Sequence, residues 1–183
     1  MLKSNKESAP AFRETQFSKT KKIVLTAMLI ALEIVLTRFL SVQLPAVRIS
    51  FGFIPIVMVA IMYGPVFAGL AAALADIIGV SLFSPFPPFP GFVATAFAAG
   101  IVYGLLLRKN PKSLPRIIIA AGIVTIIIQL GMDTLWLQMI MGEAYIALLP
   151  PRVIRTLIMF PLQVVCIRFV AQERFLRYIR QRF

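Results

Sequence analysis

The sequence contains no histidine, a single cysteine and only seven acidic residues. Without histidine it lacks the side chain most often used as a general base and metal ligand near neutral pH. Cys166 cannot form an internal disulfide, and its place in a long apolar run indicates a small buried hydrophobe. The dispersed carboxylates form no recognisable metal-ligand motif, and no GxSxG or Walker A motif occurs. An enzyme is therefore the less favoured class, and we expect no metal and no cofactor.

Charge is also scarce, since only 14% of the residues are charged, whereas a soluble domain carries roughly 25%. Hydrophobic residues make up 60% of the chain, and the mean hydropathy is +0.90. The net charge of +12 raises the question of nucleic-acid binding, but such proteins spread lysine and arginine over a solvated face. Here the basic residues form clusters between long apolar runs. This layout predicts a polytopic membrane protein with no nucleic-acid partner.

Six apolar segments approach the length of about 20 residues that a helix needs to cross a bilayer. Glycine–proline and proline-rich junctions separate them, because proline removes a backbone donor and disfavours helix in the preceding residue. The segments are 23–40, 49–63, 65–83, 91–107, 114–141 and 152–170. We therefore expect an all-α integral membrane bundle of six transmembrane helices. Residues 1–22 form a basic N-terminal segment, and residues 23–183 form the membrane domain with a basic C-terminal tail.

The basic residues predict how this bundle is oriented. Fifteen of the nineteen lysines and arginines lie in the N-terminal segment, in the connection at 108–116 or near the C-terminus. Six crossings place all three regions on one side of the membrane. Because cytoplasmic loops carry an excess of lysine and arginine, we expect both termini to be cytoplasmic in a multi-pass protein of the cell membrane.

The other four arginines, Arg38, Arg48, Arg152 and Arg155, map to the opposite half of the bundle. Arginines near helix ends can extend to lipid phosphates, which is one interpretation. The alternative is a ligand that carries negative charge. In PPRVIRTLIMFP (150–161), Arg152 and Arg155 lie one turn apart at the expected start of the last helix, where the backbone dipole also favours anions.

Three carboxylates, Glu33, Asp76 and Asp133, are expected near or beyond the middle of the membrane. A charged side chain there costs at least ~2.5 kcal/mol and usually faces a cavity or a partner. Internal ion pairing, for instance of Asp133 with Arg155, is one interpretation. A polar outer cavity that meets a solute is the other.

Aromatic side chains accompany these charges. Gln129, Asp133, Trp136 and Ile140 have helical spacing and are expected to form one stripe, and Tyr145 is expected in the outer loop that follows. The stretch SPFPPFPGF (84–92) is either an ordinary connector or a stiff loop that presents its phenylalanines to a ligand. Those phenylalanines are Phe86, Phe89 and Phe92. Beside arginines and carboxylates, such aromatics suit a flat heteroaromatic acid.

A separate surface is predicted on the first helix, where Ala27 and Ala31 in AMLIA lie four positions apart. Small residues at this spacing let another helix approach closely in a membrane. They serve either a partner protein or ordinary packing within the bundle.

Five stretches together resemble the substrate-binding S components of energy-coupling factor (ECF) vitamin transporters, and most closely the folate-specific branch. They are RISFGFIPI (48–56), MYGPVFAGLAAALADIIG (62–79), FPGFVATAFAAGIVYG (89–104), DTLWL (133–137) and LLPPRVIR (148–155). Where the family pattern has Asn-Thr-x-Trp, this chain has Asp133-Thr134-Leu135-Trp136. The resemblance covers about residues 20 to 170.

The resemblance implies a membrane subunit that captures a vitamin outside the cell. Such a subunit docks through the small residues of its first helix, here Ala27 and Ala31, on a transmembrane T component with two cytoplasmic ATPases. It is thought to topple in the membrane and carry its ligand inward. The ligand is then folate or a related vitamin, and the membrane lipid is a further partner. The expected ligand-binding residues are Arg48, Asp76, Phe86, Phe89, Asp133, Trp136, Tyr145, Arg152 and Arg155.

For the pterin ring, Asp133 is the favoured carboxylate, ahead of Asp76 and Glu33. A pterin presents two adjacent donors that match the two acceptors of a carboxylate. Two other interpretations stay open: an S component for another heteroaromatic acid, and a small membrane scaffold or enzyme whose charges pair internally. A pterin absorbance that co-purifies with the protein distinguishes these interpretations.

Overall fold

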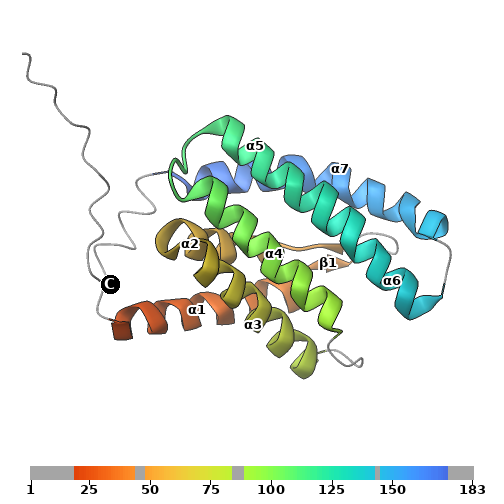
Figure 1. Cartoon of the computed structure of the whole chain (residues 1–183), viewed down its shortest axis with the longest axis horizontal. Helices are drawn as coiled ribbons and strands as arrows, with labels where there is room; N and C mark the ends of the chain where they lie inside the picture. Colours follow the sequence, from red (N-terminus) through yellow and green to blue (C-terminus); the bar gives the residue numbers. More distant parts are fainter. Residues whose placement is uncertain (1–18, 44–47, 84–88, 143–144, 173–183) are drawn as a thin grey trace, which may run out of the picture.

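A computed structural model describes residues 19–43, 48–83, 89–142 and 145–172, which form a helical bundle (Figure 1). Its helices are α1 (Lys19–Arg38), α2 (Phe53–Tyr63), α3 (Pro65–Phe83), α4 (Pro90–Leu107), α5 (Leu114–Gly122), η1 (Ile123–Met132), α6 (Asp133–Met141) and α7 (Tyr145–Val170). The strands β1 (Val42–Gln43) and β2 (Arg48–Ile49) form a short antiparallel pair. Because α5, η1 and α6 follow one another without a break, the described residues form six helical rods. The predicted all-α, six-helix bundle is confirmed.

Four helices in the described part of the chain are long and apolar enough to cross a membrane: Pro65–Phe83, Pro90–Leu107, Leu114–Ile140 and Leu149–Val170. Helix α2 is apolar but has only 11 residues. Helix α1 has the length, but three lysines, Glu33 and Arg38 interrupt its apolar character. Many large apolar side chains are exposed around the bundle, among them Leu82, Met139 and Leu157. Such a surface suits lipid rather than water.

The core is built around α2, whose residues from Pro55 to Ile61 are all buried. Helices α3 and α4 pack closely beside it because glycines line their contact. A Cβ at Gly100 would meet the carbonyl group of Ala68, and one at Gly104 would meet the backbone of Pro65. Small residues at a helix interface allow this close approach of two backbones.

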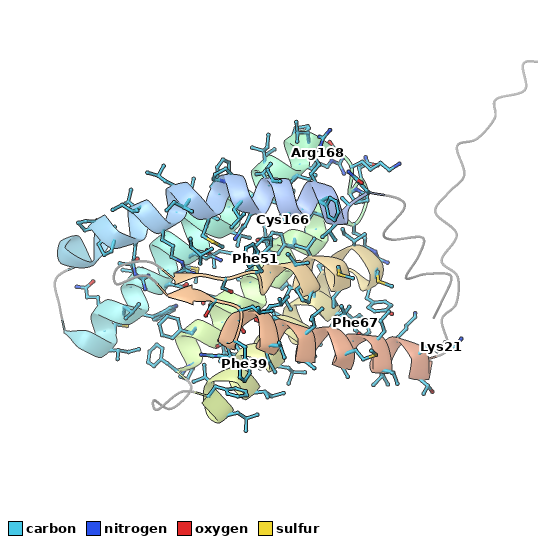
Figure 2. The ribbon with its side chains drawn as sticks, turned by 180° about the vertical axis from the view of Figure 1, so that it is seen from behind. Lys21, Phe39, Phe51, Phe67, Cys166 and Arg168 are labelled. Carbon is cyan, nitrogen blue, oxygen red and sulfur yellow. The ribbon has the colours of Figure 1, made fainter. Side chains whose placement is uncertain are left out.

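The start of α1, the α4–α5 connection and the end of α7 lie together at one end of the bundle (Figure 1). Figure 2 shows Lys21 and Arg168 near this end. We call it the basic end, and it carries Lys21, Lys22, Arg108, Lys109, Lys112, Arg116 and Arg168. The end of α3, the start of α4, the end of α6 and the start of α7 lie at the opposite end. The clusters that are separate in sequence therefore lie at the same end of the bundle.

Helix α7 differs from its predicted bounds. It begins at Tyr145 rather than Arg152, and it contains Pro150, Pro151 and Pro161. Each proline removes a backbone donor inside the helix, but prolines are tolerated in membrane helices because neighbouring helices and side chains satisfy the freed backbone groups. The expectation that Tyr145 lies in a loop is therefore wrong. The expectation that Arg152 and Arg155 gain from a helix N-terminus is also wrong, because both lie inside α7.

Two further boundaries differ. Helix α2 begins at Phe53 rather than residue 49, because Arg48 and Ile49 pair with Gln43 and Val42 in the two-stranded hairpin. The long helix predicted over 114–141 contains the π-helical segment η1. A π-helix bonds i to i+5 and therefore turns less per residue than an α-helix. Gln129 lies in η1, so its four-residue spacing to Asp133 does not follow α-helical geometry, and the predicted stripe stays a prediction.

Candidate ligand-binding site

The first turn of α6 brings three residues to the centre of the candidate site, and two of them, Asp133 and Trp136, are predicted from the sequence. Asp133 is the first residue of α6, and Thr134 and Trp136 follow it. Thr134 is fully buried, and its hydroxyl group donates a hydrogen bond to the backbone carbonyl of Leu130 in η1. The Nη1 of Arg152, on α7, donates to the Thr134 oxygen over 3.0 Å. A buried hydroxyl thus joins α6 to the arginine pair of α7.

Arg155 lies one turn beyond Arg152 on α7 and has electrostatic interactions with both Asp133 and Arg152. The predicted attraction between Asp133 and Arg155 is therefore present. It leaves hydrogen-bonding capacity unused, because the Oδ1 of Asp133 and the Nε of Arg155 are buried without a hydrogen-bond partner. Leaving a buried polar group unsatisfied costs roughly 1–3 kcal/mol. Internal pairing alone does not account for these atoms.

Aromatic rings lie beside this pair. The ring centroid of Trp136 is 5.9 Å from that of Phe89, which precedes α4, and Phe89 is 6.0 Å from Phe92. Gly91 leaves space for the rings of Trp136 and Phe89, since a Cβ there would lie 2.5 Å from Trp136 Cδ2 and 2.6 Å from Phe89 Cε1. The indole Nε1 of Trp136 is buried without a hydrogen-bond partner. Stacking surface and an available donor therefore occur together.

A second group of charges lies between α1 and α3. Glu33 has electrostatic interactions with Asp76 and Arg38, and Asp76 interacts with Arg38. The guanidinium group of Arg38 packs over Gly79, where a Cβ would lie 3.2 Å from its Nε. Glu33 Oε2, Asp76 Oδ2 and Arg38 Nε are buried without hydrogen-bond partners.

The two groups are electrostatically coupled, because Asp133 interacts with Asp76 as well as with Arg152 and Arg155. Three carboxylates and three guanidinium groups therefore share one region of the bundle. Unpartnered donors and acceptors, next to aromatic rings, suit the binding of a solute that has both acidic and heteroaromatic parts.

The structure thus brings together Asp76, Asp133, Trp136, Arg152 and Arg155, with Phe89 beside them. Arg48 lies in β2, a strand that contacts α7. Tyr145 is the first residue of α7. Phe86 lies outside the described residues, so its predicted role stays a prediction.

Two threonines were not among the predicted site residues. Thr134 holds Arg152, and Thr95 on α4 is buried and interacts with the Asp133 carboxylate. Each is a hydroxyl inside an otherwise apolar helix, but threonines in helices commonly bond to their own backbone. Thr125 does so with Ala121, over 2.7 Å. Sequence pattern therefore does not separate Thr134 from Thr125. Arg38, predicted in the outer half but not as a ligand residue, also joins the site.

Ala27 and Ala31 lie apart from this region, on the exposed side of α1. Leu25, Leu29 and Ile34 form the buried side of the same helix. The two alanines are therefore not buried by packing within the bundle, which was one of the two interpretations of this pair.

Comparison with known proteins gives consistent results. The family model "ECF transporter, substrate-specific component" matches residues 21–171. A protein named folate transporter FolT from Clostridium novyi is 40% identical over 149 residues, which cover 81% of this chain and 87% of that protein. A second protein of that name, from Leuconostoc mesenteroides subsp. mesenteroides, is 39% identical over 151 residues, covering 79% of this chain and 81% of the relative.

A solved structure agrees with these relatives. The crystal structure of FolT bound with folic acid has a TM-score of 0.77 and 38% sequence identity to this chain. The match covers 83% of this chain and 92% of that one. The family model spans most of the sequence, the relatives align over most of their own lengths, and the fold agrees. The chain belongs to the substrate-specific components of ECF transporters.

Proposed function

We propose that this chain is the folate-binding subunit of an ATP-driven ECF importer. The observation that carries the proposal is the set of unpartnered polar atoms of Asp76, Asp133 and Arg155 beside Trp136. The relatives named as folate transporters, and the similar structure that contains folic acid, support the choice of ligand.

In this proposal each end of folate has its own group of residues. The pterin ring stacks on Trp136 and Phe89, and its two adjacent donors bind the carboxylate of Asp133, with Asp76 as the second candidate. The glutamyl tail carries two carboxylates. Arg152 and Arg155 bind them because a planar guanidinium group can pair bidentately with a carboxylate and keeps its charge. Arg48, Phe86 and Tyr145 complete the site as further ligand contacts.

The proposal includes six membrane crossings with both termini in the cytoplasm of a cell-membrane protein. The basic end then faces the cytoplasm, as the excess of lysine and arginine on cytoplasmic loops favours. The subunit docks through Ala27 and Ala31 of α1 on a T component that carries two cytoplasmic ATPases. The exposure of both alanines supports this surface.

The test uses Trp136, the single tryptophan in the sequence. Its place in the site makes its fluorescence a direct reporter, so we expect saturable quenching when folic acid is added to the purified protein in detergent. Riboflavin, a heteroaromatic vitamin without a pterin, serves as the comparison. Saturation by riboflavin but not folic acid would assign the chain to another vitamin. Saturation by neither would favour a scaffold with internally paired charges.

A further inference from the structure

The contact between Thr134 and Arg152 has a direction that the sequence does not reveal. The hydroxyl hydrogen of Thr134 is directed to the carbonyl of Leu130. The oxygen of Thr134 then has its lone pairs available, and it accepts the Nη1 hydrogen of Arg152 over 3.0 Å. Because a hydroxyl has one hydrogen, its bond to the carbonyl makes it an acceptor toward the arginine.

This contact joins separate elements. Leu130 lies in η1, Thr134 lies in the first turn of α6, and Arg152 lies in α7. Thr134 is fully buried, so water does not replace its hydroxyl group as the partner of the guanidinium. The backbone carbonyl of Arg152 also accepts a hydrogen bond from Thr156, over 2.9 Å.

We infer that Thr134 is a positioning residue, which orients the Arg152 guanidinium for the anionic end of the ligand. The inference rests on the proposed function for the identity of that ligand. Arginine has a long flexible side chain, and ordering it on binding costs conformational entropy. A hydrogen bond that already orders the guanidinium in the free protein lowers this cost. Thr134 therefore contributes to affinity without a contact to the ligand.

The helix supplies a matched control in Thr125. Thr125 is also fully buried, and its hydroxyl bonds to a carbonyl four residues earlier, over 2.7 Å, as Thr134 does. The hydroxyl group of Thr125 donates to the backbone carbonyl groups of Ala121 and Gly122. Thr125→Val thus removes a buried hydroxyl from the same helical rod but leaves the arginine pair unchanged.

The experiment is a double-mutant cycle with folate and with pteroate, which lacks the glutamyl tail. We expect Thr134→Val to weaken folate binding about tenfold, because the guanidinium group of Arg152 must then be ordered when the ligand binds. The loss for pteroate is expected to be much smaller. Thr134→Ser, which keeps the hydroxyl, restores affinity, and Thr125→Val leaves it unchanged. In the Arg152→Ala background, Thr134→Val has no further effect because the residue that it positions is absent.

An equal loss from Thr134→Val in both backgrounds would overturn the inference, and so would a serine variant as weak as the valine variant. Failure of the proposed function looks different, since the wild-type protein then binds neither folate nor pteroate. In that case the unfolding temperatures of the same four variants are measured without ligand. Thr134→Val is expected to lower the unfolding temperature more in the wild-type background than with Arg152→Ala, because only the wild type also loses the bond to the arginine, and equal shifts in both would refute the contact.

Discussion

Single residues in this protein are most informative where a buried polar atom has no partner. Asp76, Asp133 and Arg155 each have such an atom, and each lies in an apolar helix where a charge is costly. A fold that keeps these charges without satisfying them is better suited to binding a solute than to stability alone. Gln163 is a mixed case: its Oε1 accepts a hydrogen bond from the buried Tyr103 hydroxyl, over 2.9 Å, and so joins α4 to α7, whereas its Nε2 is buried without a hydrogen-bond partner.

Alanine at Asp133 or Asp76 tests the carboxylate contact to the pterin ring. We expect Asp133→Ala to weaken folate binding by ~1–3 kcal/mol, since a charged hydrogen-bond acceptor is lost, and Asp76→Ala to have the smaller effect. Because pteroate contains the same pterin ring, its affinity is expected to fall by a similar factor. Isothermal titration of both ligands measures this. Unchanged affinity in both variants would eliminate the carboxylate contact.

Arg155→Lys and Arg152→Ala test the contact to the glutamyl tail. Each is expected to weaken folate binding by ~1–3 kcal/mol, because lysine lacks the planar fork and alanine lacks the charge. The loss is expected to shrink for pteroate. If these arginines only contact lipid phosphates, Arg155→Lys is instead expected to leave folate affinity unchanged. A fluorescence titration with both ligands decides, and an equal loss for folate and pteroate would show that these arginines do not bind the tail.

At the scale of elements, α1 has two distinct faces. Leu25 and Leu29 are buried, whereas Ala27, Met28 and Ala31 are exposed, and within the described residues α1 packs mainly on α2 and α3. An exposed apolar face with small residues every four positions is suited to close approach by another helix.

Tryptophan on this face tests it as a docking surface. We expect Ala27→Trp and Ala31→Trp to abolish folate uptake by the assembled transporter, because a bulky indole prevents close helix approach. Folate binding by the isolated subunit is expected to stay near normal, since both alanines lie away from the site. Val165→Trp, an exposed position on α7, is the control and leaves uptake intact. Wild-type uptake in both alanine variants, at normal expression, would remove this surface from the mechanism.

The contact between α3 and α4 depends on glycine, which a stability measurement tests. Gly100→Ala is expected to destabilise the protein by ~1–3 kcal/mol, because its Cβ meets the Ala68 carbonyl group and the helices must separate. Gly122→Ala is the control. Its Cβ would lie 3.7 Å from Phe160, an ordinary contact, so alanine is neutral or stabilising by up to ~1 kcal/mol there. Thermal unfolding in detergent compares them, and equal behaviour of the two variants would contradict the close contact.

Across the whole molecule, positive charge is distributed unevenly and is concentrated at the basic end. Lysines and arginines from α1, the α4–α5 connection and α7 gather there, although long stretches of sequence separate them. The buried charged groups with an unpartnered atom belong instead to the candidate site: Glu33, Arg38, Asp76, Asp133 and Arg155.

Cysteine labelling tests the proposed orientation. In a Cys166→Ala background, Lys109→Cys places one thiol at an exposed position of the basic end. We expect a membrane-impermeant maleimide to label it in inside-out vesicles but not in intact cells. Gln138→Cys, exposed near the end of α6, is expected to show the reverse pattern. Labelling of Lys109→Cys in intact cells would place the basic end outside.

Local sequence is sufficient for the class of the protein and for its six helices. Apolar runs and the positions of lysine and arginine are properties of neighbouring residues, and they directly reflect transfer into lipid. They also single out Asp76, Asp133 and Arg155, because a charge in an apolar run is conspicuous in the sequence alone. The same reasoning misplaces the start of α7, since a proline pair is a strong local signal for a break.

The remaining features depend on contacts between residues that are far apart along the chain. Asp76 and Asp133 interact only because α3, α4 and α6 pack together, and Thr134 differs from Thr125 only because Arg152 of α7 lies against it. Hydropathy and helical period say which face is apolar, but many packings bury the same face. The choice among them depends on how side chains such as the glycines of α4 fit their neighbours, so the partners of each buried charge are settled by packing in three dimensions.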